Sequence, residues 1–424
     1  MRIFKIFSFL IILFLCFKNI NLTHIVYPFK KSTKEKNSYP EDLLRNDIEI
    51  TLEIGTPPQS IDLNLRSKVY AFFVSSSDLG LPYPTFNSKL STSFIQLSKN
   101  ENNFQNQEYK KGYKIDETIT INNKKIEHMT LVYATEISYQ QAGALGLRLI
   151  KANEFRGNLS FIYQIKVLAN LDNYAYTLRY DSDEKGELII GSYPHLYDKN
   201  FDGKNFYITR ARDIGSTLDW VYVFDAIKYN NKTIMGIVTR SLIQIEFGLI
   251  QAPSNLKKYF IENFFHNYCK EENYDKRNIT IIHCHKSLDI TKFKNISFIL
   301  KDIDYEFILT YEDLFVEYNN EYIFSIVFSN ELISSKTYWI LGKPFMKKYQ
   351  LVYDLDKKTI GLYKNGNNNK NKKSFKFNIY IVILSALVLI IIGLGVYIFN
   401  YLKKPKRNKA FELDDDNFDY IPTS

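Results

Sequence analysis

Between about residues 46 and 364 the chain alternates short apolar or β-branched runs with turn residues. Residues 48–54 read Ile-Glu-Ile-Thr-Leu-Glu-Ile, the period-two alternation of a strand with one buried face. Similar short runs occur at 118–121, 188–190 and 222–227, and glycines separate them. Long helical periodicity is absent from the sequence. The pattern predicts an all-β body built from two β-barrel-like or sandwich domains.

Two other segments are almost wholly apolar. Residues 1–18 have a basic start followed by an apolar stretch, which predicts a secretory signal peptide, with a retained signal anchor as the alternative. Residues 379–399 carry no charge over 21 positions, and about 20 apolar residues cross a bilayer core. This run predicts a transmembrane helix; a buried helix of a soluble domain is the alternative. Because the signal peptide directs the body out of the cytosol, we expect a single-pass type I membrane protein.

Composition excludes several classes of protein. The chain has 424 residues, of which 45% are hydrophobic and 24% charged, so it is not wholly disordered. Its net charge of +9 comes from lysines spread along the chain. Without a zinc-finger spacing or an RNP-like aromatic motif, that charge does not predict nucleic-acid binding. Neither a GxGxxG turn after a strand nor a Walker loop is present, so no cofactor is expected.

The cysteines favour a disulfide over a metal site. Cys16 lies in the expected signal peptide, which leaves Cys269 and Cys284 as a pair in an oxidising compartment. Their bridge closes a loop of about 15 residues and contributes roughly 3 kcal/mol in the chain-entropy model. The rival is a metal held by His266, Cys269 and the His283-Cys284-His285 run. Adjacent ligands on a strand point to opposite faces, so we expect no metal.

Potential N-glycosylation sites agree with a body outside the cytosol. Asn-x-Ser/Thr sequons occur at Asn158, Asn231, Asn278 and Asn295. Because an asparagine-rich chain forms sequons by chance, they support this location without fixing it. We expect the body to lie in the secretory or endosomal lumen or outside the cell.

Several local motifs occur in an order that is characteristic of one family. They are Glu53–Gln59 (EIGTPPQ), Ala142–Leu147 (AGALGL), Glu187–Ser192 (ELIIGS), Tyr338–Phe345 (YWILGKPF) and Val352–Asp356 (VYDLD). Together they resemble the pepsin-like aspartic peptidases over nearly the whole body. The resemblance implies a bilobal fold, two β-barrel-like lobes around a cleft. In that family each lobe gives one aspartate to a dyad that shares a proton and activates water.

The resemblance assigns a role to each part of the chain. The expected parts are a signal peptide at 1–22, a short basic pro-like segment at 23–45, an N-terminal lobe at 46–205, a C-terminal lobe at 206–364, an Asn/Lys-rich stalk at 365–378, a transmembrane helix at 379–399 and a cytoplasmic tail at 400–424.

Both catalytic motifs of the family are replaced in this sequence. Where the resemblance places Asp-Thr-Gly, the first loop reads Arg66-Ser67-Lys68 and the second reads Gln244-Ile-Glu246. An arginine has no usable lone pair and a glutamine does not titrate, so neither can act as a general base. We therefore expect no catalytic residue. Phe104 or Gln105 stands where the family has the tyrosine of its flap.

The sequence thus predicts a proteolytically inactive membrane protein that binds a peptide or protein ligand through its ectodomain. The candidate cleft residues are Arg66, Ser67, Lys68, Phe104, Gln244 and Glu246. Two cationic side chains in the first loop favour an acidic partner or a C-terminal carboxylate. We expect Glu246 to form an ion pair with Arg66; the alternative is that both side chains point to solvent. Two alternatives stay open: an active atypical aspartic endopeptidase using Glu246, and an adhesion or structural ectodomain.

Overall fold

The structure is a computed structural model, and it describes residues 24–33, 38–103, 108–121, 123–149, 159–211, 213–214, 217–265, 268–329, 338–364 and 394. Phe104, Asn158, His266, the expected signal peptide, stalk and tail, and all but one residue of the 379–399 run lie outside these ranges. The chain forms two compact units, Met1–Asn368 and Asn369–Ser424, and every element named below belongs to the first. Within the described residues, no helix is long and apolar enough to span a membrane.

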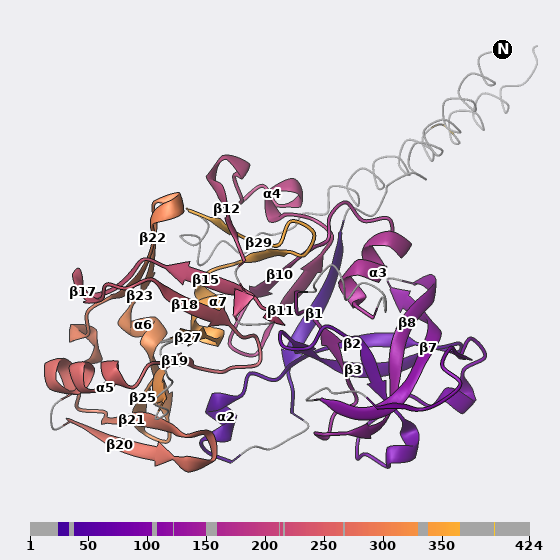
Figure 1. The fold of residues 1–424 in the computed structure, drawn as a ribbon, viewed down its shortest axis with the longest axis horizontal. Helices are drawn as coiled ribbons and strands as arrows, with labels where there is room; N and C mark the ends of the chain where they lie inside the picture. Colours follow the sequence, from indigo (N-terminus) through magenta and orange to yellow (C-terminus); the bar gives the residue numbers. More distant parts are fainter. Residues whose placement is uncertain are drawn as a thin grey trace, which may run out of the picture. The chain divides into compact units, whose positions relative to one another are not determined.

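A large sheet holds most of the first lobe and extends into the last strands of the body (Figure 1). Its order is β12 (Phe206–Arg210), β29 (Thr359–Tyr363), β28 (Val352–Asp354), β10 (Ala175–Tyr180), β11 (Lys185–Ile190), β1 (Ile25–Lys31), β2 (Ile48–Ile54), β3 (Gln59–Arg66), β9 (Gly143–Gly146), β4 (Phe73–Ser75), β8 (Lys124–Ile137), β7 (Tyr109–Ile121) and β5 (Ile95–Gln96), with β6 (Asn102–Asn103) paired to β7. Since β10 pairs with β28, strands from both halves of the sequence are joined in one sheet.

The second lobe is built on two further sheets. One has the order β15 (Val221–Phe224), β18 (Thr239–Ile243), β27 (Tyr338–Leu341), β19 (Ile250–Ala252), β26 (Ile326–Ser329), β21 (Ile279–His285), β25 (Glu321–Phe324) and β24 (Phe315–Tyr318), with β20 (Cys269–Tyr274) paired to β21. The other has the order β17 (Lys232–Met235), β16 (Ala226–Tyr229), β22 (Ile296–Leu300) and β23 (Tyr305–Leu309). A small hairpin, β13 (Asp213–Ile214) and β14 (Thr217–Leu218), stands apart from them.

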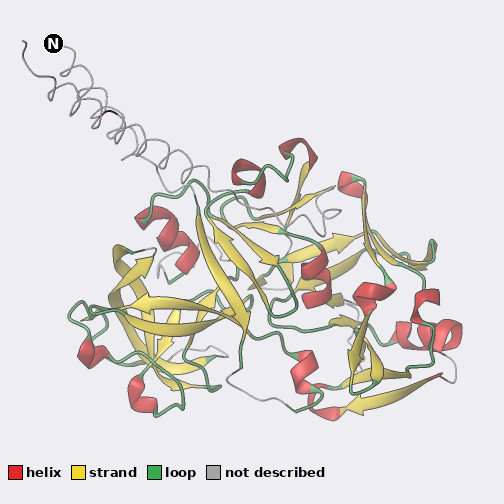
Figure 2. Ribbon diagram, turned by 180° about the vertical axis from the view of Figure 1, so that it is seen from behind, coloured by secondary structure: helices red, strands yellow, loops and turns green. Residues whose placement is uncertain are grey.

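The helices are short and occur between the strands of the sheets (Figure 2). They are α2 (Glu41–Leu44), α3 (Phe161–Leu168), α4 (Pro194–Tyr197), α5 (Asn255–Phe260), continued by a π-helical turn at Ile261–Phe265, α6 (Tyr311–Leu314) and α7 (Lys343–Lys348). The mainly β body expected from the sequence is therefore confirmed, and its two-lobed arrangement fits the expected fold.

Strand β2 shows how the sequence pattern becomes a core. The side chains of Ile48, Ile50, Leu52 and Ile54 are at most 2% exposed, whereas Thr51 and Glu53 face solvent. This is the alternation read from the sequence. Glu49 departs from it, because its carboxylate is buried and lies 3.7 Å from the ammonium group of Lys30 on the neighbouring strand β1.

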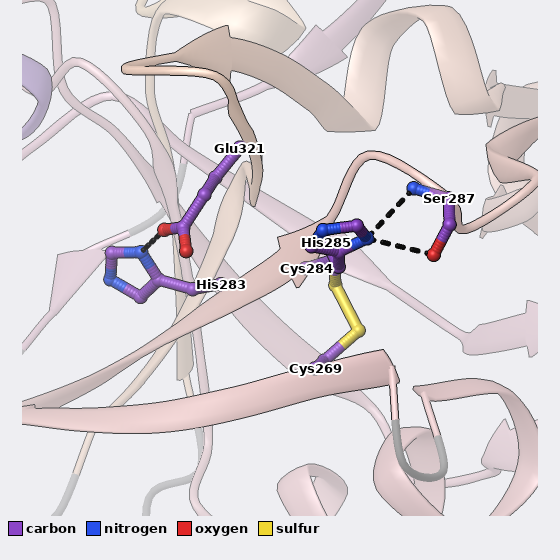
Figure 3. The surroundings of a disulfide bond; sticks show 6 residues. All are labelled: Cys269, His283, Cys284, His285, Ser287 and Glu321. Atoms are coloured by element: carbon purple, nitrogen blue, oxygen red, sulfur yellow. Dashed lines mark hydrogen bonds and ion pairs between the residues drawn. A yellow bond between two sulfur atoms is a disulfide. The ribbon is translucent and has the colours of Figure 1, made fainter.

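The cysteine pair is joined as predicted. Cys269 on β20 and Cys284 on β21 face each other in register and form a disulfide (Figure 3). Figure 3 shows His283 directed toward Glu321, away from the sulfur atoms, as expected for adjacent strand residues. His285 is exposed and its ring contacts Ser287. Among the residues that the structure describes, no group of side chains could hold a metal ion.

Residues 25–31, which the sequence analysis placed in a pro-like segment, form strand β1 inside the large sheet. Residues 25–30 pair with β11, and residues 29–31 pair with β2. Pro28 lies where β1 has a partner on one side only, so its missing N–H leaves no neighbouring carbonyl unpaired. This part of the N-terminal segment is thus a structural strand of the body.

Candidate functional site

The two loops that the resemblance assigned to catalysis meet in the structure. Arg66 is the last residue of β3, and Gln244 directly follows β18. Ser67 joins the loops: its hydroxyl accepts a hydrogen bond from the backbone N–H of Ile245 at 3.1 Å and donates one to Glu246 Oε2 at 2.6 Å. The Ser67 N–H donates to the same carboxylate oxygen at 3.0 Å. The sequence therefore predicted correctly which two segments form the common centre.

Parallel strand pairs set the direction of both loops. β3 runs parallel to β9, and β18 runs parallel to β27, so that Arg66 lies opposite Gly146 and Ile243 opposite Leu341. A Cβ atom on Gly146 would stand 2.5 Å from the backbone carbon of Tyr70. Only glycine allows this approach. The glycine of the AGALGL motif thus packs against the first loop.

Arg66 is buried and bound to carboxylates. Its side chain is 8% exposed, its Nη1 donates to Asp47 Oδ1 at 2.7 Å, and its Nε lies 3.7 Å from Glu108 Oε1. Burial alone would lower the pKa of the guanidinium, but the charges of Asp47, Glu108 and Glu246 outweigh it and raise that pKa. Arg66 is therefore a permanent cation in the place of an ionisable acid.

The partners of Arg66 are themselves held by other groups. Asp47 Oδ2 lies 2.6 Å from Arg45 Nε, and Glu108 Oε2 accepts a hydrogen bond from Gln141 Nε2 at 2.6 Å. Arg66, at the end of β3, thus links Asp47, just before β2, to Glu108, just before β7. Neither Asp47 nor Glu108 was singled out from the sequence, because no local motif marks a residue whose partner lies tens of positions away.

The negative charge of Glu246 helps to raise the pKa of Arg66, although Glu246 is not its hydrogen-bonding partner. Its carboxylate is occupied by the two donors of Ser67, whereas Arg66 binds Asp47 and Glu108. A carboxylate held by two donors of a neighbouring loop forms a structural link between the loops. Among the described residues, no ion pair joins Arg66 to Glu246, so the pair expected from the sequence does not form, and Ser67 binds the Glu246 carboxylate instead.

A segment before β2, residues 38–47, runs along the second loop; we call it the strap. Leu44 O accepts a hydrogen bond from the Gly248 N–H at 2.9 Å, and the Asn46 N–H donates one to Glu246 O at 3.0 Å. The Asn46 side chain also donates to Ile245 O at 2.8 Å. A Cβ on Gly248 would stand 2.0 Å from Leu43 O, so the strap and loop fit only with glycine there. The second loop is therefore covered along its backbone by the chain itself.

The start of the strap is fastened to the second lobe by polar groups. The Tyr39 hydroxyl lies 2.5 Å from His283 Nε2 and 3.0 Å from Glu272 Oε2. Glu41 pairs with Arg277 at 2.5 Å and accepts from the Tyr274 hydroxyl at 2.8 Å. Burial would raise the pKa of Glu41, but these partners outweigh it and lower that pKa to about 2.

The remaining candidate residues have different surroundings. Lys68 is exposed, and within the described part of the chain it makes no ion pair. Gln244 is 8% exposed, and its Oε1 has no hydrogen-bond partner among the described residues. Phe104 lies outside the described residues. The centre thus offers an exposed ammonium group and a buried amide, while its nearby carboxylates are bound to Arg66 or Ser67.

The sequons that fall on described residues are at the surface. Asn231 lies at the turn between β16 and β17, Asn278 precedes β21, and Asn295 precedes β22; all three are exposed. Asn158 lies outside the described residues. A glycan attached at any of these three positions would extend into solvent.

Two lobes of strands joined through one sheet, each sending a loop from a strand end to a common centre, define the fold of a bilobal pepsin-like aspartic peptidase. The chain belongs to this family: the model of the eukaryotic aspartyl proteases matches residues 49–365. The family resemblance read from the motifs is thereby confirmed. No curated protein matches the chain.

Proposed function

We propose that this protein is a membrane-anchored, proteolytically inactive member of the family, whose ectodomain binds a peptide or protein ligand. The observation that carries the proposal is the state of Arg66. A dyad needs two ionisable carboxyl groups that share one proton above a bound water. Here a buried guanidinium occupies the first position, with its hydrogen bond made to Asp47, and an amide occupies the second.

The surroundings of the centre support binding in place of hydrolysis. Because the charge of Arg66 is balanced by Asp47 and Glu108, it is Lys68 that offers an available positive charge. A ligand that presents a carboxylate to Lys68 matches this feature, as the C terminus of a peptide does.

Anchoring and location follow from the sequence. The apolar stretch after the basic N terminus supports export, and the 21 uncharged residues 379–399 support a single membrane span. The body then lies in the secretory or endosomal lumen or outside the cell, where Cys269 and Cys284 can form their bridge and where Asn231, Asn278 and Asn295 can be glycosylated.

One experiment tests both catalysis and binding. The immobilised ectodomain is incubated at pH 4 to 7 with a peptide library whose members have free or amidated C termini, and mass spectrometry identifies the retained and the cleaved peptides. We expect retention without cleavage, enrichment of free C termini, and a loss of about two- to fivefold in retention for Lys68→Ala, the scale of one exposed charge pair. An active family member on the same library is the positive control.

Two results would contradict the proposal. Cleavage by the wild type that disappears in Glu246→Gln identifies an atypical peptidase. Neither cleavage nor retention of any peptide would mean that the centre binds no peptide, and an adhesion or structural role would replace it.

A further inference from the structure

Both described ends of the body lie at helix α4. At the N-terminal end, the ring of His24 stacks on that of Tyr197 with the centroids 4.4 Å apart. At the C-terminal end, the N–H of Lys364 donates to Asn205 O at 3.0 Å, and the Tyr363 hydroxyl lies 2.7 Å from His195 Nδ1. In Figure 1, α4 and β12 lie together at one side of the body. We call this surface, residues 194–210 with Lys364, the exit face.

The exit face carries two large apolar side chains in solvent. Leu196 on α4 is 58% exposed, and Ile208 on β12 is 45% exposed. Phe206 packs on His195, with the ring centroids 5.2 Å apart, and Ile208 is two residues further along the strand, so it lies on the same side as α4. Single exposed apolar residues are ordinary. Here two of them lie on the surface that also holds both described ends of the body.

The charges around these side chains are mainly positive. Lys199 and Lys204 are exposed. Of the two acidic residues on this face, Asp198 lies 3.5 Å from Arg179 and Asp202 accepts from the Lys204 N–H. Apolar side chains with lysines and tyrosines around them are what a headgroup layer with phosphate groups accommodates.

The length of the following chain limits which face can meet a membrane. Residues 365–378 separate the body from the apolar run that starts at 379. Fourteen residues span at most about 50 Å, whatever shape they take. A compact domain of this size has a radius of gyration of about 20 Å, hence a diameter of about 50 Å. A bilayer that contains residues 379–399 is therefore within reach of the exit face. The opposite face is not, because the path around half of a body about 50 Å in diameter is about 80 Å long.

We propose that the exit face docks on the bilayer, with Leu196 and Ile208 in the headgroup layer and Lys199 and Lys204 on lipid phosphates. The proposal rests on the membrane anchoring proposed above. Attachment to the same bilayer gives a high effective concentration, so that a weak surface affinity is enough for docking.

The test uses the full chain reconstituted into liposomes of phosphatidylcholine and phosphatidylserine that contain a brominated lipid. Tryptophan is introduced by Leu196→Trp, and the matched control is Leu90→Trp. Leu90 is 59% exposed and precedes β5, which is at the other end of the large sheet from β12. The native Trp220 and Trp339 are at most 1% exposed and give a constant background. Flotation after alkaline carbonate extraction reports anchoring separately.

We expect the chain to float and the brominated lipid to quench the added tryptophan at 196 at least twice as strongly as that at 90. The same contrast should appear when cysteines from Leu196→Cys and Leu90→Cys are labelled with a water-soluble maleimide, with slower labelling at 196 in liposomes and equal labelling in detergent. A chain that floats but shows equal quenching at both positions refutes the docking and leaves the anchoring intact. A chain that carbonate removes from the membrane overturns the anchoring and the docking together.

Discussion

Replacement of Arg66 by methionine tests whether the cation holds the centre together. In Arg66→Met the carboxylates of Asp47 and Glu108, which are 14% and 13% exposed, lose a buried positive partner. Breaking a buried pair costs about 3–5 kcal/mol. Arg45 still lies 2.6 Å from Asp47, and the methionine restores apolar packing, so we expect a net loss of about 2–3 kcal/mol in the free energy of unfolding.

The measurement is urea unfolding of residues 24–364 at pH 7, followed by tryptophan fluorescence. The loss should shrink in Arg66→Met/Asp47→Asn, since the uncompensated charge is then removed. Lys68→Met is the matched control, because that lysine is exposed and makes no ion pair with described residues; we expect a change within about 0.5 kcal/mol. If Arg66→Met were as stable as the control, Arg66 would not be the organising charge of the centre.

Three further predictions concern other contacts. In the folded state the pKa of Glu41 is lowered from 4.5 to about 2, so the ionised carboxylate stabilises the fold above pH 4.5. This contribution disappears as the pH falls from 4.5 to 2. Glu41→Gln should therefore remove that part of the acid dependence of urea unfolding, up to about 3 kcal/mol. Ser67→Ala should lose about 2 kcal/mol in the same assay while Ser67→Thr keeps most of it, and equal losses would argue against the link to Ile245. Replacing Cys269 and Cys284 by serine should cost about 3 kcal/mol, and a reducing agent should then have no further effect.

The sequence predicted the parts of this protein that depend on local pattern. The alternation in 48–54 gave a strand with the expected buried face, and the disulfide formed between the two expected cysteines. The order of family motifs also placed the loops at 66–68 and 244–246 next to each other, as the contacts of Ser67 show.

What the sequence did not predict depends on contacts between distant positions. Asp47 and Glu108 are ordinary acidic residues until folding brings them to Arg66. The strap pairs with the second loop through backbone groups, about 200 positions away, which no side-chain pattern encodes. Strand β1 was also not predicted, because the lysines of this stretch led to its assignment as a basic pro-like segment.

The cluster around Arg66 has a consequence for the evolutionary history of this chain. An aspartate at position 66 would place a fourth acid beside Asp47, Glu108 and Glu246, with Arg45 beside Asp47 as the cation that remains, and we expect it to destabilise the fold by several kcal/mol. We therefore expect position 66 to vary together with positions 47 and 108, because a change of charge at one of them is compensated only by a change at another.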